Sequence, residues 1–246
     1  MSTTAAWPEP SPSPVRSLEG LGAAVVVSLA LCAVVDLASI VNLVIDNRML
    51  SQAIEEPGSV SHDRLQLSDT LAAASGGART LALLVTAILF LVWLARGVGN
   101  LSVWSIPRHG RAMSIISWFI PILAWFIPKQ VVNDLWRAGE QRDDYPVVFN
   151  VWWAMWIVTN LIYFGALRRD ATNAELAELR DYNNHDIAAS AADVVAAVLC
   201  IVVVREITRR HAERAVTAQP AQRWPQAPRD FETRSGWQRP AEDAGA

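Results

Sequence analysis

Four long runs of apolar residues constrain this chain most strongly, because each has a length that suits a helix crossing a lipid bilayer. They cover residues 21–45, 80–95, 147–167 and 187–204. At about 1.5 Å per residue, such helices reach about 24 to 37 Å, against a hydrocarbon core of about 30 Å. Charged residues make up only 18% of the chain, below the share typical of soluble domains. We therefore expect an all-α, polytopic membrane bundle with four full spans.

A fifth apolar segment, residues 113–136, is broken by proline. Its centre reads IISWFIPILAWFIP, and Pro121 and Pro128 each lack the backbone N–H that a continuous helix needs. Two structures fit this pattern. One is a short span whose Lys129 reaches the headgroups, and the other is a re-entrant segment that enters the bilayer and returns.

The basic residues bear on orientation, since cytoplasmic loops of membrane proteins are rich in Lys and Arg. Outside the distal tail, four spans with a cytoplasmic N-terminus put eleven basic residues on the cytoplasmic side, and five spans with an external N-terminus put ten there. A difference of one residue does not choose between them. Both arrangements place the C-terminus in the cytoplasm, so we predict a multi-pass plasma membrane protein with a cytoplasmic C-terminus.

The two ends of the chain differ in composition from its middle. Residues 1–17 contain four prolines, and residues 217–246 lack apolar periodicity. We expect both to be disordered tails that flank a helical membrane domain over residues 18–216.

Two short helices and two turns are expected in the loops of this domain. Pro57 with Gly58, and Gly76 with Gly77, signal turns. A short helix is expected over residues 63–74, and another after residues 172–175, which read TNAE and match a capping box.

Four stretches of the chain resemble a known family. SWFIPILAWFIPKQVVNDLWRAG, at residues 117–139, resembles the signature of the bacterial membrane family called domain of unknown function 4328. FLVWLARGVGNL, VWWAMWIVTNL and VVREITRRHAERA are similar to its other characteristic stretches. The resemblance covers residues 21–215. It implies membrane placement and architecture and supplies no catalytic residue, because the family has no established activity.

Two sets of polar residues are unusual in this apolar setting. Asp36 and Asp193 lie inside the first and last runs, where an ionised carboxylate costs roughly 2.5–3.5 kcal/mol on insertion scales. They indicate either a polar site, such as a proton or cation relay, or paired side chains that hold helices together. Lys129, Asn133 and Asp134 follow the Pro-broken segment. They fit a headgroup or ligand site, or the polar face of an interfacial helix.

Basic and aromatic residues form two further groups. Arg205, Arg209, Arg210 and Arg214 lie on a helix expected to continue the last span to residue 216. They are candidate contacts for anionic lipid, at about 1 kcal/mol each near the surface, and they also fit a role in setting topology. The aromatic group fits either a ligand cage or ordinary packing, and consists of Trp118, Phe119, Trp125, Phe126, Trp152, Trp153 and Trp156.

Enzymatic chemistry finds little support in the sequence. The four histidines lack metal-binding spacing, and neither a phosphate-binding Gly-rich loop nor a nucleophile elbow occurs. A net charge of −3 gives no basic field for nucleic acid. We predict no catalytic residue, cofactor or metal. The expected partners are the lipid bilayer and either other membrane proteins or further copies of the chain.

The leading function is therefore a non-enzymatic scaffold or interaction protein of the membrane. The alternative is a small transporter, channel or proton-coupled component that uses the intramembrane aspartates. An intramembrane enzyme acting on lipid would need a polar catalytic cluster that the sequence does not show.

Overall fold

The computed structural model describes residues 15–139, 147–166 and 175–223, and these contain helices and no strands. The predicted all-α class is confirmed, and four of the helices are long and apolar enough to cross a membrane, which is the number that the sequence predicts. The helices are α1 (Glu19–Glu55), α2 (His62–Trp104), α3 (Arg111–Ile116), α4 (Pro121–Ala124), α5 (Ile127–Gly139), α6 (Val147–Ala166) and α7 (Leu176–Arg223).

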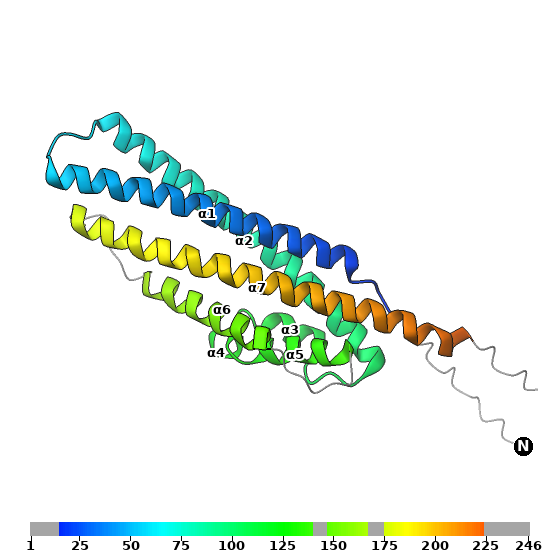
Figure 1. Cartoon of the computed structure of the whole chain (residues 1–246). Coiled ribbons are helices and arrows are strands. Elements are labelled where there is room, and N and C mark those ends of the chain that lie inside the picture. The colour runs from blue at the N-terminus through cyan, green and yellow to red at the C-terminus, as the bar shows by residue number, and fades with distance from the viewer. Residues whose placement is uncertain (1–14, 140–146, 167–174, 224–246) are drawn as a thin grey trace, which may run out of the picture.

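Helix α1 packs between α2 and α7 and runs antiparallel to both (Figure 1). Along its seam with α7, Gly22 lies against Thr208, and Asn47 donates a hydrogen bond of 2.7 Å to Asn184. The number of the α7 residue falls as that of the α1 residue rises, as antiparallel helices require. Helices α1 and α2 have the same geometry, because Cys32 lies 3.3 Å from Thr86, Sγ to Oγ1, and the later Asp46 accepts a hydrogen bond from the earlier Ser68.

The start of α1 lies beside the end of α2. The backbone N–H of Arg16 donates to Oδ1 of Asn100 at 2.9 Å, and Nδ2 of Asn100 donates back to the carbonyl of Arg16 at 2.6 Å. The α1–α2 loop and the start of α7 lie at the opposite end of the bundle (Figure 1). We call these the terminal end and the loop end. Helices α1 and α6 run from the terminal end to the loop end, and α2 and α7 run back.

The Pro-broken segment forms the three short helices α3, α4 and α5, which pack against the terminal half of the bundle (Figure 1). Pro121 is the first residue of α4 and Pro128 the second of α5, positions where a missing N–H leaves no helical bond unmade. Leu135 of α5 packs against Gly97 near the end of α2. The segment therefore returns to the end from which it started and does not cross the bundle, a path that fits the predicted re-entrant segment better than the predicted short span.

The α1–α2 hairpin extends beyond the apolar runs at the loop end. Helix α1 continues to Glu55, past residue 45, and α2 begins at His62, well before residue 80. At about 1.5 Å per residue these extensions are about 15 and 27 Å long. The predicted turn at Pro57 and Gly58 is confirmed, because Gly58 has a φ of +94°, a conformation that glycine adopts without strain.

The prediction of a turn at Gly76 and Gly77 is wrong, whereas the helix predicted over residues 63–74 is present and is longer than predicted. Both stretches belong to α2, which is continuous from His62 to Trp104. The physical reason is that Ala72, Ala73, Ala74 and Ala78 surround the two glycines, and extending an existing helix is easier than starting one.

The predicted boundaries around α7 also need correction. The helix expected after residues 172–175 is the beginning of α7 itself, and α7 continues to Arg223, past the predicted start of the C-terminal tail at residue 217. Each extension adds hydrogen bonds to a helix that already exists, which needs no new nucleus. Residues 172–174 of the capping box lie outside the described residues, as do residues 1–14 and 224–246 of the predicted tails.

Candidate functional site

Asp36 and Asp193, the two carboxylates predicted to lie within spans, are brought together by Arg79. Nε of Arg79 lies 2.9 Å from Oδ1 of Asp36. Nη2 of the same guanidinium donates a hydrogen bond to Oδ2 of Asp193. Asp36 belongs to α1, Arg79 to α2 and Asp193 to α7, so one guanidinium joins three spanning helices.

Tyr163 connects the fourth spanning helix, α6, to this group. Its hydroxyl donates a hydrogen bond of 2.6 Å to Oδ2 of Asp193. The guanidinium of Arg79 also lies over its ring, 4.9 Å from the ring centre, within the range of a cation–π contact. Asp36, Arg79, Tyr163 and Asp193 form what we call the ion cluster, and it touches each of the four helices that can span.

The ion cluster lies inside the apolar zone, nearer the loop end. Asp36 precedes the end of its run by nine residues, and Asp193 follows the start of its run by six, which places the carboxylates about 9–14 Å inside that boundary. The side chain of Asp36 is 6% exposed, whereas those of Arg79 and Asp193 are 27% and 25% exposed. An unpaired ionised group at this depth costs free energy. Ion pairing of the two carboxylates with the Arg79 guanidinium is therefore the more favourable arrangement.

The sequence patterns did not single out Arg79 or Tyr163. Arg79 directly precedes the second apolar run, where an interfacial anchor is ordinarily found. A usable signal was nevertheless present. Asp36 lies 21 residues before Pro57, and Arg79 lies 21 residues after Gly58. Folding the chain into an antiparallel hairpin at that turn places the two residues side by side.

The second predicted polar set lies in a different part of the bundle. Oδ1 of Asp134 on α5 is 3.7 Å from Nε of Arg108, which lies in the loop between α2 and α3. Lys129 and Asn133 are on the same short helix. The predicted intramembrane site therefore divides into two groups. Asp36 and Asp193 belong to the ion cluster, and Lys129, Asn133 and Asp134 belong to the Pro-broken segment at the terminal end.

The aromatic group divides into tryptophans that pack against one another and rings that are exposed. Trp118, Trp152, Trp153 and Trp156 are packed, whereas Phe119, Trp125 and Phe126 are exposed. The ring of Trp118 makes edge-to-face contacts with Phe90, Trp153 and Trp156, at centroid distances of 5.4, 6.3 and 5.6 Å. Trp153 and Trp156 stack at 4.8 Å. These geometries are those that aromatic pairs prefer. The contacts support the packing interpretation for the tryptophans involved, and they hold the Pro-broken segment against α2 and α6.

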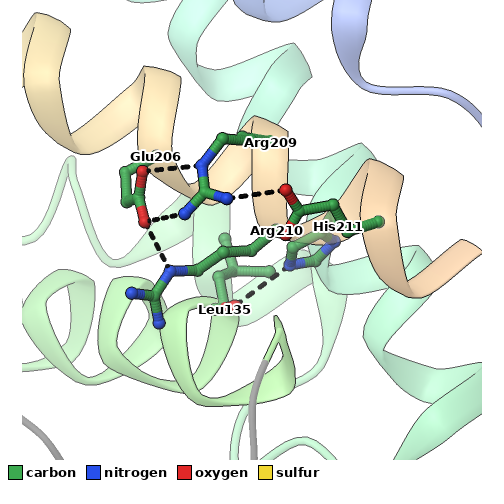
Figure 2. Close-up of polar contacts among 6 residues, drawn as sticks. Leu135, Glu206, Arg209, Arg210 and His211 are labelled. Atoms are coloured by element: carbon green, nitrogen blue, oxygen red, sulfur yellow. Dashed lines mark hydrogen bonds and ion pairs between the residues drawn. The ribbon is translucent and has the colours of Figure 1, made fainter.

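The basic residues after the last apolar run are extensively paired (Figure 2). Arg209 donates hydrogen bonds of 3.0 and 2.5 Å to Glu206 and one of 2.6 Å to Glu213. Arg210 donates a further bond of 2.9 Å to Glu206. Two of the four arginines predicted to contact anionic lipid are thus largely neutralised within the helix. Arg205 is exposed, and a lipid contact there stays a prediction.

The same region fastens α7 to α5 and α2. Arg210 lies 3.6 Å above the ring centre of Trp136, and Arg214 lies 5.0 Å above that of Trp104. The ring of His211 is buried, and its Nε2 donates a hydrogen bond of 3.0 Å to the carbonyl of Leu135 (Figure 2). These side chains hold the end of the Pro-broken segment in place.

Within residues 15–139, 147–166 and 175–223, no group of three His, Cys, Asp or Glu side chains is placed to hold a metal ion. Comparison with known families gives one match, to the family described as domain of unknown function DUF4328, over residues 56–209. The match includes Arg79, Tyr163 and Asp193, whereas Asp36 precedes it. No curated protein and no solved structure matches the chain.

Proposed function

The chain belongs to the DUF4328 family, whose description gives no activity, and we propose from its geometry that it is a non-enzymatic scaffold or interaction protein of the membrane. The observation that best supports this proposal is that the charged and polar side chains of the ion cluster pair with one another. Its polar groups bind one another across four helices, which supports a role in fixing the helices in one arrangement.

The α1–α2 hairpin is the surface through which such a scaffold would engage its partner. Half of the α2 residues before position 80 are polar, yet Leu65, Leu67 and Leu71 among them are exposed. Lipid does not cover a surface beyond the apolar runs, and exposed apolar side chains there favour contact with protein. The partner we propose is another protein with an apolar surface outside the bilayer, either a different membrane protein or a second copy of this chain.

We place the terminal end in the cytoplasm of a bacterial plasma membrane. Four crossings put both termini on the same side, and Arg205, Arg209, Arg210 and Arg214 lie just beyond the last apolar run at that end. Basic residues close to the ends of spans favour the cytoplasmic side. The α1–α2 hairpin would then face the opposite side of the membrane.

Site-specific photo-cross-linking tests the scaffold proposal. A benzoylphenylalanine replacing Leu67, which is 59% exposed on the hairpin, is compared with one replacing Leu83, which is 62% exposed inside the apolar run. In native membranes we expect a discrete protein adduct from position 67 and none from position 83. The adduct is read by gel shift and mass spectrometry.

A second substitution gives this experiment its control. Leu71 lies one helical turn from Leu67, and Leu71→Asp places a charge on the same surface. We expect it to reduce the adduct from position 67 by tenfold or more, an estimate at the scale of losing about 1.4 kcal/mol of contact. Position 67 yielding no more protein adduct than position 83 would count against the proposal.

A further inference from the structure

We propose that the ion cluster binds one exchangeable proton and that Asp36 carries it. The inference concerns the chemistry of Asp36, Arg79 and Asp193 and does not depend on the scaffold function. Its ligand is the proton itself, taken up from water at the loop end of the bundle.

The first argument is charge balance. Two carboxylates share one guanidinium, so the fully ionised cluster has a net charge of −1 in an apolar surrounding, where an uncompensated charge is costly. Asp193 is also close enough for its negative charge to repel that of Asp36. One proton on either carboxyl removes both the net charge and the repulsion, as in pairs of carboxylates that share a proton.

The hydrogen bonds identify the carboxyl that takes the proton. Oδ2 of Asp193 accepts bonds from both Arg79 and Tyr163, and such bonds stabilise a carboxylate in its charged form. Oδ1 of Asp36 lies at ion-pair distance from Arg79, but within the described chain no hydrogen bond reaches this oxygen. Asp36 is also the more deeply buried of the two. Asp193 therefore stays ionised and Asp36 is the protonated partner.

Two hydroxyl groups without a described hydrogen-bond partner lie one helical turn from residues of the ion cluster. Ser190 precedes Asp193 by one turn of α7, and Thr159 precedes Tyr163 by one turn of α6. Both hydroxyls are buried, and neither has a hydrogen-bond partner among the residues that the structure describes. Such groups ordinarily bind water, which is the species a proton needs in order to reach and leave the cluster.

The other charged and titratable groups near Asp36 come from the helices packed around it. Arg79 comes from α2, Asp193 from α7 and, through Asp193, Tyr163 from α6. His185 lies two turns before Asp193, with Nε2 at 3.3 Å from the carbonyl of Ile162. Releasing the proton restores the repulsion between α1 and α7, so the seam between these helices becomes sensitive to pH.

Infrared spectroscopy of the full chain in lipid nanodiscs tests this inference. A protonated carboxyl has a C=O band that ionisation removes and deuterium oxide shifts. In the wild-type chain at mildly acidic pH we expect one such band that depends on Asp36, lost as the pH is raised through neutrality. Asp36→Asn, which keeps the shape of the side chain, should abolish the band. Asp46→Asn on the same helix is the matched control and should leave it unchanged.

Three outcomes would overturn the inference. The wild-type chain, which requires no substitution to fold, could show no protonated carboxyl at mildly acidic pH beyond what Asp36→Asn shows. The band could survive Asp36→Asn and vanish in Asp193→Asn, which would move the proton to the other carboxyl. Sodium ions could abolish the band at fixed pH, which would make the cluster a metal cation site.

Discussion

Arg79→Leu is expected to lower the free energy of unfolding by about 3–5 kcal/mol, the scale for removing one partner of a buried ion pair. The substitution takes away the only cation of the ion cluster as described here and leaves Asp36 and Asp193 without it. The measurement is thermal unfolding of the purified protein in detergent. Arg64→Leu, on an exposed part of the same helix, is the control and should have little effect.

Neutralising the two carboxylates as well should recover most of the lost free energy of unfolding. The triple variant Arg79→Leu, Asp36→Asn, Asp193→Asn contains no buried charge from the ion cluster, and replacing a whole buried ion pair with neutral groups is often close to neutral in stability. We expect it to recover more than half of the lost free energy. A triple variant no more stable than Arg79→Leu alone would show that charge imbalance is not the reason for the loss.

Trp118→Ala is expected to detach the Pro-broken segment, at a cost of about 3–5 kcal/mol for an aromatic side chain removed from a packed site. Trp118 is the residue through which the turn between α3 and α4 contacts Phe90 of α2 and Trp153 and Trp156 of α6. We expect faster amide hydrogen exchange over residues 111–139 and a lower unfolding temperature.

Its neighbour provides the control for this prediction. The side chain of Phe119 is 72% exposed, so Phe119→Ala should leave both measurements close to the wild-type values. Equal effects of the two substitutions would mean that the aromatic contacts of Trp118 are not what holds the segment.

The spans were predictable because a bilayer requires about 20 apolar residues in a row, and each run of this length or near it became a helix. The Pro-broken segment was recognisable from Pro121 and Pro128. The return of this segment to the terminal end could not be predicted from the sequence, because the return depends on close contacts between residues that are far apart in the chain. Gly97 lies against Leu135, and Gly99 lies against the guanidinium of Arg111. In the sequence these glycines are only two small residues in a long helix.

The candidate site was predictable in part for a similar reason. A carboxylate inside an apolar run is easily recognised, so Asp36 and Asp193 could be predicted as candidate site residues from the sequence. Arg79 stands at the edge of a run, where lipid headgroups and the bundle interior are equally within reach of a long side chain. Which way it points is decided by the antiparallel alignment of α1 and α2, a tertiary feature that residue composition does not contain.

The central claim is that the chain crosses the membrane four times, with the Pro-broken segment returning to its own side. Labelling of single cysteines by an impermeant maleimide in sealed vesicles tests it directly, after Cys32 and Cys200 have been replaced by Ala. We predict that Ser105→Cys and Thr217→Cys are labelled from one side, and Ser59→Cys and Glu175→Cys from the other. Labelling of positions 105 and 217 from opposite sides would mean that the segment crosses, and would contradict the account.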